Sequence, residues 1–210
     1  IGWLFVAALL AVYGLYFYVY NLKNGYPYIS YDLKGIGFIM MIAVPILTMR
    51  SLSDERKTKT DQLMLTSPVS VGKIVAGKYF AMAAVYTIDI AIFALSPLVL
   101  SIYGRVALSE AYVALFGYWL YGLSCIAVGL FISSISESVI ISAILTFAAL
   151  FLSYMMQSIT GLISSSGNLL TMVLNCFDLY TPFENFVSGC FSVTSAAYYV
   201  TVILLLCFLT

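Results

Sequence analysis

Apolar stretches long enough to cross a membrane recur along the whole of this 210-residue chain. A membrane-spanning helix needs about 20 apolar residues, because the hydrocarbon core is roughly 30 Å thick. Only 9% of the residues are charged, compared with about 25% in ordinary soluble domains, and 63% are apolar. The sequence therefore predicts an all-α polytopic membrane protein.

Polar and turn-forming segments divide the apolar sequence into six predicted spans within a single transmembrane domain, residues 1–210. The connector Asn21–Lys34 contains Gly25 and Pro27, which favour a turn, and residues 157–194 are rich in Ser, Gly and Asn. The predicted spans cover about residues 1–20, 35–50, 79–103, 111–132, 139–156 and 196–210.

Charged side chains are concentrated in the polar segment Arg50–Lys78, which holds nine of the 18 charges in the chain. Six of the nine Lys and Arg residues lie there, and short loops rich in these residues stay on the cytoplasmic side of a membrane. The sequence therefore predicts a cytoplasmic polar segment, with residues 21–34, 104–110 and 157–194 on the other side.

The polar segment has its own helix signals. Thr60 followed by Asp61 is typical of a helix start, and Pro68 disfavours helical backbone at the residue before it. These signals predict a short helix over about residues 60–67, followed by Ser70 as the cap of span three. Glu55 and Lys59, spaced (i, i+4), favour a span two that continues past the membrane.

Two interpretations of the short helix are open on composition alone. Its apolar side chains could rest on the lipid headgroups, as those of an interfacial helix do. Alternatively, they could fit a groove on a cytoplasmic partner. The apolar residues in and after this helix are Leu63, Met64, Leu65 and Val69.

Three parts of the polar segment resemble the first cytoplasmic loop of ABC-2 type permeases, the membrane subunits of ATP-binding-cassette exporters. They are Glu55, the stretch Lys59–Ser70 (KTDQLMLTSPVS) and Ile74–Lys78 (IVAGK). The common family form has Gly and Glu where this chain has Lys59 and Gln62. Gly129–Phe147 and Phe183–Gly189 are also similar to later parts of the family sequence.

The resemblance implies that the short helix is a coupling helix, which docks on an ABC ATPase subunit. By this resemblance the ATPase-coupling residues are Glu55, Thr60, Asp61, Gln62, Leu63, Leu65, Pro68, Val69 and Ser70. It further implies a second permease subunit, in a homodimer or heterodimer, and a re-entrant helical hairpin on the outer side before the last span. The expected location is a bacterial plasma membrane.

This chain is not expected to bind ATP itself. Gly72-Lys73 and Gly77-Lys78 lack the upstream glycine and the following Ser or Thr of a phosphate-binding P-loop. We therefore expect ATP and Mg²⁺ to bind to a partner ATPase, with no cofactor or metal in this chain. The chain has no histidine and a single deep acid, which excludes Ser–His and Asp–Asp hydrolase sites. The alternative to an exporter subunit is a non-transporting scaffold that anchors an ATPase.

Three further residues are candidate site residues. Asp89, in the middle of span three, could contact substrate or protons in a pathway, or be a neutral acid that ties spans together. Cys176 and Cys190 flank the expected hairpin and are a candidate disulfide on the oxidising outer side; the alternative is two buried thiols.

The cargo is not specified by any motif, but the side chains expected to face a cavity are apolar. In spans two and five they are Phe38, Met40, Phe147 and Phe151. They favour a hydrophobic or amphipathic cargo. The zero net charge argues against a nucleic-acid partner.

Overall fold

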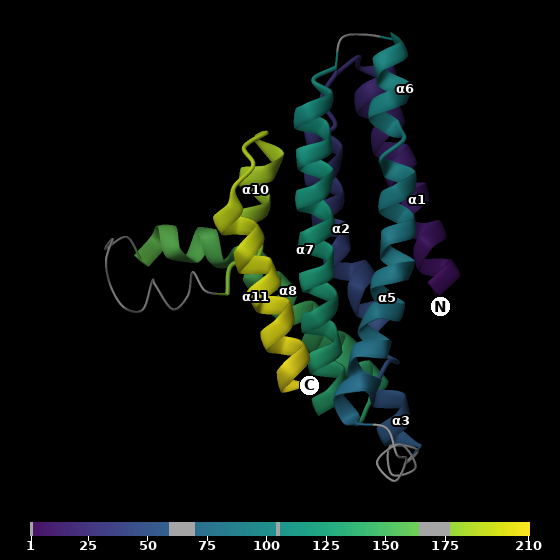
Figure 1. Ribbon diagram of the computed structural model, residues 1–210, viewed down its shortest axis with the longest axis vertical. Helices are drawn as coiled ribbons and strands as arrows, with labels where there is room; N and C mark the ends of the chain where they lie inside the picture. Colours follow the sequence, from purple (N-terminus) through teal and green to yellow (C-terminus); the bar gives the residue numbers. More distant parts are fainter. Residues whose placement is uncertain (1, 59–69, 104–105, 164–176) are drawn as a thin grey trace.

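The computed structural model describes residues 2–58, 70–103, 106–163 and 177–210, and this part of the chain is helical without any strand (Figure 1). The predicted all-α class is confirmed. In chain order the helices are α1 (Gly2–Phe17), the π-helix η1 (Tyr18–Lys23), α2 (Ser30–Thr48), α3 (Ser53–Lys57), α5 (Val71–Phe93), α6 (Ser96–Tyr103), α7 (Leu108–Ile135), α8 (Val139–Ile163), α10 (Thr181–Val187) and α11 (Val193–Leu209).

Five of these segments are long and apolar enough to cross a membrane: Gly2–Lys23, Ser30–Lys57, Val71–Ile102, Leu108–Ile135 and Val139–Met156. They correspond to the first five predicted spans. The sixth predicted span corresponds to α11, which is apolar but has 17 residues. The multi-pass architecture is therefore confirmed, whereas the count of six spans stays a prediction.

Helix α7 is the central element of the bundle. In Figure 1 it stands between α5 and α11, and it packs against α2, α5, α8, α10 and α11. In its most apolar window 72% of the residues are buried, compared with 17–39% for the other four spans. The side chains of α1, α5 and α8 therefore leave wide apolar faces uncovered by the chain itself, as expected of helices that contact lipid.

Two glycines of α7 allow neighbouring helices to come close. A β-carbon added at Gly122 would lie 2.3 Å from the ring of Tyr86 on α5. One added at Gly129 would lie 2.4 Å from the Thr48 hydroxyl on α2. Small residues at such contacts are a common basis for helix association in membranes, since lipid provides no hydrophobic drive between spans.

The third span differs from the single helix predicted over residues 79–103. It begins earlier, at Val71, and it is interrupted between α5 and α6. Pro97 is the physical reason, because proline lacks the N–H that would bond to the carbonyl of Phe93. The hydroxyl of Ser96 donates to that carbonyl at 2.7 Å instead.

The connector predicted over residues 21–34 is also shorter in the structure. Helix α2 begins at Ser30, and Asp32 therefore lies in its first turn, fully buried. The hydroxyl of Ser30 donates to the carbonyl of Val187 at 3.1 Å, which joins the start of α2 to the end of α10.

Replacing Gly122 with alanine tests the close approach of α5 and α7. The added methyl group has to displace the Tyr86 ring, and overpacking of this kind costs about 1–3 kcal/mol. We expect a lower thermal midpoint in detergent for Gly122→Ala. The matched control is Gly14→Ala, where no atom lies within 4 Å of the added carbon and the midpoint should stay or rise. Equal midpoints in the two variants would contradict the close packing.

Candidate functional site

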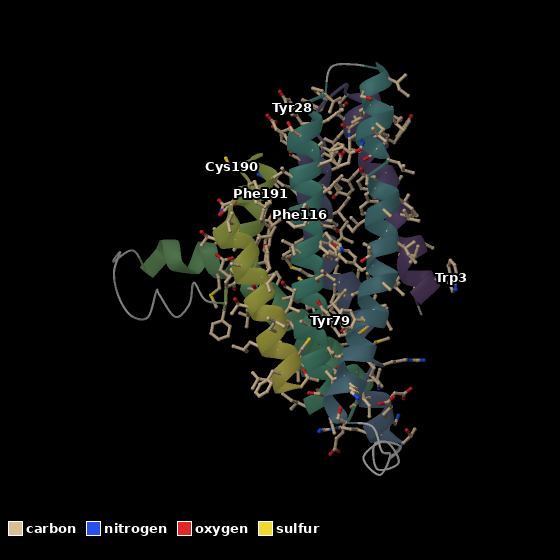
Figure 2. All side chains as sticks on the ribbon, viewed as in Figure 1. Trp3, Tyr28, Tyr79, Phe116, Cys190 and Phe191 are labelled. Carbon is tan, nitrogen blue, oxygen red and sulfur yellow. The ribbon has the colours of Figure 1, made fainter. Side chains whose placement is uncertain are left out.

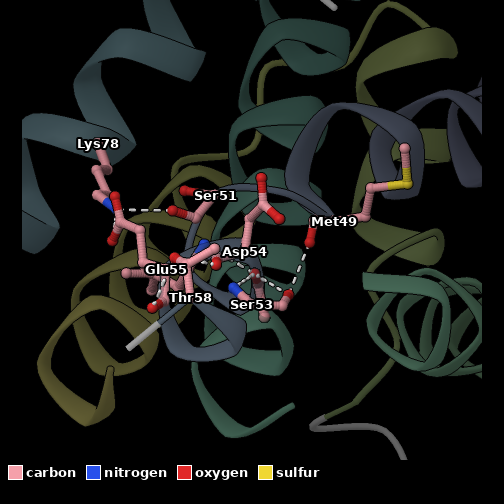
Figure 3. Close-up of polar contacts among 9 residues, drawn as sticks. Met49, Ser51, Ser53, Asp54, Glu55, Thr58 and Lys78 are labelled. Atoms are coloured by element: carbon pink, nitrogen blue, oxygen red, sulfur yellow. Dashed lines mark hydrogen bonds and ion pairs between the residues drawn. The ribbon is translucent and has the colours of Figure 1, made fainter. Parts of the chain in front are cut away.

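The candidate site is the α2–α5 junction, which we define as residues 49–58 together with Lys78 of α5 and Ser133 of α7. It flanks the part of the polar segment at which the coupling helix is predicted. Figure 1 places it at the end of the bundle that carries α3, and Figure 3 shows its polar contacts. The structure describes the polar segment on both sides, at residues 50–58 and 70–78.

Ser133 fixes the turn between α2 and α3 onto α7. Its hydroxyl oxygen accepts from the backbone N–H groups of Leu52 and Ser53, both at 3.1 Å. The Ser53 hydroxyl lies 2.9 Å from it and donates to the carbonyl of Met49 at 2.7 Å. Ser53 and Ser133 are fully buried. A buried turn thus has its backbone groups paired with a side chain from another helix, as buried polar groups require.

These contacts correct the expectation that span two continues as one helix beyond the membrane. Helix α2 ends at Thr48, and the five-residue helix α3 starts at Ser53. The physical reason is that Ser133 accepts the two N–H groups at the break. An (i, i+4) charge pair contributes only about 0.2–0.5 kcal/mol, too little to outweigh such contacts.

Lys78 connects α5 to this turn. Its ammonium group forms a salt bridge with the Glu55 carboxylate and donates to the carbonyl of Ser51 at 2.6 Å (Figure 3). The two side chains of the salt bridge are 18% and 26% exposed, so solvent screens the pair less than it would a surface pair. Arg56 adds a weaker contact with the Ile135 carbonyl, at 3.3 Å. Helices α3, α5 and α7 are thereby joined at one end of the bundle.

The structure describes two of the predicted coupling residues. Glu55 lies in the junction, and Ser70 occupies the N-cap position of α5, where its carbonyl accepts from the Lys73 N–H at 2.9 Å. The predicted helix over 60–67 lies outside the described residues, as do Thr60, Asp61, Gln62, Leu63, Leu65, Pro68 and Val69. Their coupling role stays a prediction.

Lys78 and Ser133 are site residues that the sequence alone does not predict. Lys78 ends the IVAGK motif, and the (i, i+4) spacing pairs Glu55 with Lys59, whereas the structure pairs Glu55 with Lys78. No sequence signal distinguished Ser133 from Ser134, since the two are adjacent. Only the position of α2 selects Ser133.

Asp89 on α5 has no exposed surface and lies within electrostatic range of Tyr118 on α7. Neither of its oxygens has a hydrogen-bond partner among the described residues, and the same holds for the nearby Tyr118 hydroxyl. The structure therefore places this acid inside the bundle of a single chain. Both interpretations from the sequence, a pathway group or a neutral acid, stay open.

The predicted hairpin before the last span is described in part. Asp178 accepts from the N–H groups of Tyr180 and Thr181, at 3.0 and 2.9 Å, and Pro182 lies in the first turn of α10. Cys190 is exposed beyond α10, directly before Phe191 in the chain (Figure 2). Its predicted partner Cys176 lies outside the described residues, so the disulfide stays a prediction.

The four side chains expected to face a cavity do not share one environment. Phe38 on α2 and the stacked pair Phe147 and Phe151 on α8 are 37–43% exposed. Met40 is fully buried in the core, because helical spacing turns it away from the face that carries Phe38. The prediction that Met40 faces a cavity was therefore wrong.

Among the described residues no group of three His, Cys, Asp or Glu side chains could hold a metal ion.

Comparison with known proteins gives one result. A family model described as ABC-2 family transporter protein matches residues 5–210, which is nearly the whole chain. Searches of curated proteins and of solved structures found no match.

Replacing Ser133 with alanine tests the attachment of the turn. The N–H groups of Leu52 and Ser53 lose their partner, at a cost of about 1–3 kcal/mol, so their hydrogen exchange should accelerate about tenfold. The measurement is hydrogen–deuterium exchange in lipid nanodiscs. Ser134→Ala is the matched control, because that hydroxyl bonds to the Phe131 carbonyl of its own helix. The same exchange rate in both variants would show that Ser133 does not hold the turn.

Proposed function

Because this chain belongs to the ABC-2 family of transporter proteins, and is thus a permease of an ABC-type transporter, we propose that it couples ATP hydrolysis by a partner ATPase to export. The family match carries the proposal, since it covers residues 5–210. Permeases of this family associate with an ABC ATPase in the membrane. ATP and Mg²⁺ bind to the ATPase in this proposal, and this chain performs no chemistry.

The α2–α5 junction supports the coupling step. The described residues before the predicted coupling helix end at Thr58, and those after it begin at Ser70, the N-cap residue of α5. On the entry side, α3 is tied to α5 by Lys78 and to α7 by Ser133. On the exit side, α5 continues as one helix for 23 residues. A force applied by the ATPase to residues 59–69 would therefore tilt α5 and the end of α2 together.

A second permease subunit completes the transport path in this proposal. The exposed aromatic side chains of α2 and α8 are suited to such a seam, since the chain itself leaves them uncovered: Phe38, Phe147 and Phe151. An apolar seam favours a hydrophobic or amphipathic cargo. Asp89 would reach this path only when the packing around α5 opens, because its side chain is fully buried within the single chain.

The topology proposed here follows from the charges. The polar segment faces the cytoplasm, where the ATPase is found, and the turn between η1 and α2 faces outward. The proposed location is the plasma membrane of a bacterium.

Charged residues in the predicted coupling helix should prevent docking. We expect that the double variant Leu63→Asp, Val69→Asp no longer retains the ATPase that copurifies with the wild-type chain, because buried unpaired carboxylates oppose an apolar contact. The variant should keep the helicity and thermal midpoint of the wild type. The control is Phe80→Asn, an exposed apolar position on α5 outside the predicted coupling helix. Retention of the ATPase by the double variant would contradict the assignment of this helix.

The scaffold alternative is tested on the same complex. An exporter subunit should support ATP-dependent movement of a lipid-like fluorescent probe across vesicles that contain the complex. If an ATPase copurifies and hydrolyses ATP while no member of a panel of apolar and amphipathic probes moves, the scaffold function is favoured.

A further inference from the structure

A buried acid–amide pair lies at the end of the bundle opposite the α2–α5 junction. Asn21 of η1 is 5% exposed and Asp32 of α2 is fully buried. The side-chain N–H of Asn21 donates to the Asp32 Oδ2 atom. The other oxygen of each side chain, Oδ1 in both residues, is buried and has no hydrogen-bond partner among the described residues. The pair is therefore half satisfied.

The two remaining oxygens lack a donor. The amide oxygen of Asn21 can only accept, and so can both oxygens of an ionised Asp32. Burying such groups without partners is costly, most of all for a charge. A proton on Oδ1 of Asp32 removes this cost, because the resulting O–H group can donate to the free amide oxygen of Asn21. The neutral acid and the amide can then exchange two hydrogen bonds.

We propose that Asn21 and Asp32 form a proton-binding site, in which Asp32 is held as the neutral acid and Asn21 is its partner. Binding takes one proton from water and forms the O–H bond of the acid; release returns the proton and leaves a carboxylate. This site is separate from the α2–α5 junction and does not depend on coupling to an ATPase.

The surrounding groups favour a proton over other ways of neutralising Asp32. The two nearest lysines in the sequence are not buried with Asp32: Lys23 is exposed, and the Lys34 side chain is 46% exposed. The Lys34 Nζ atom lies 3.9 Å from the Glu184 Oε1 atom of α10. The helices packed on α2 carry tyrosine hydroxyls and two acids: Tyr13 and Tyr16 on α1, Tyr118, Tyr121 and Glu110 on α7, Tyr154 on α8 and Glu184 on α10. Tyr13 lies within electrostatic range of Asp32, and its hydroxyl bonds to Ser96.

A metal ion fits this place poorly. The pair offers two free oxygens, whereas Ca²⁺ takes six to eight and Mg²⁺ takes six in near-octahedral geometry. In the part of the chain that the structure describes, no group of three His, Cys, Asp or Glu side chains could hold a metal ion. A proton needs neither a cavity nor further ligands.

The consequence of proton release is a weaker attachment of η1. Asn21 is the buried residue of this π-helix, and α1 buries only Phe5, Leu9 and Tyr13. The acid–amide pair is therefore the buried polar contact between η1 and α2, beside the packing of α1 on α2. Ionised Asp32 would have one amide donor and no cation, so the segment Tyr18–Ile29 should separate more often from α2. The pair would make this part of the transporter respond to pH.

Infrared spectroscopy tests the proton directly. In wild-type protein in nanodiscs, labelled with ¹³C at the aspartate carboxyl, we expect a protonated-acid C=O band that disappears as the pH rises. Asp32→Asn should remove this band, whereas Asp89→Asn, a change at the other deep acid, should leave it.

If Asp32→Asn gives the wild-type spectrum at every pH, Asp32 is ionised and the proposal is wrong. If Asp32→Asn does not fold, Asn21→Leu should shift the band, because it removes the partner; an unshifted band would overturn the pairing.

Hydrogen exchange tests the consequence. After correction for intrinsic rates, amides of Tyr18–Ile29 in the wild type should exchange about five- to thirtyfold faster once Asp32 has lost its proton. Asp32→Asn, a neutral side chain of the same shape, should make exchange there independent of pH. Amides near Ser133, in the α2–α5 junction, are the internal control and should not respond. A pH response that persists in Asp32→Asn would assign it to another group and overturn the proposal.

Discussion

The close packing of other helices around α7 is the constraint on which the rest of the structure depends. Lipid is as apolar as the side chains of a span, so helices gain little from avoiding it and have to gain from close contact and hydrogen bonds. Gly122 and Gly129 allow this contact with α5 and α2, respectively. The positions of α2 and α5 relative to α7 then determine which polar groups meet at the two ends of the bundle.

At one end, contact between α2 and α7 brings Ser133 to the break after Thr48. The break directs α3 toward α5, where Glu55 meets Lys78. At the other end, α2 carries Asp32 to Asn21 of η1. Polar contacts thus join helices at both ends of the bundle, in addition to the packing and hydrogen bonds between α5 and α7 along its length. Because α2 takes part in the contacts at both ends, a force at one end and a proton at the other could each act on the same helix.

The two ends have different relations to the proposed function. In the proposed function, the α2–α5 junction transmits force from the ATPase, because it lies where the polar segment joins the bundle. The acid–amide pair instead rests on two residues outside the motifs that resemble the family. A transporter built in this way could respond to ATP through one end and to pH through the other, with α2 as the element that both ends share.

The sequence by itself determined the fold class, the family and the positions of the first five spans, because apolar length and local motifs carry that information without tertiary contacts. It also located Ser70 as the N-cap position of α5, since the start of a helix is signalled by neighbouring residues in the chain. The sequence did not indicate the end of α2 at Thr48 or the partner of Lys78, and Met40 was assigned to a cavity although it lies in the core. Asp32 was read as part of a polar connector. Only the tertiary structure decided these points, because each depends on a residue from a distant helix that α7 and α2 bring into contact.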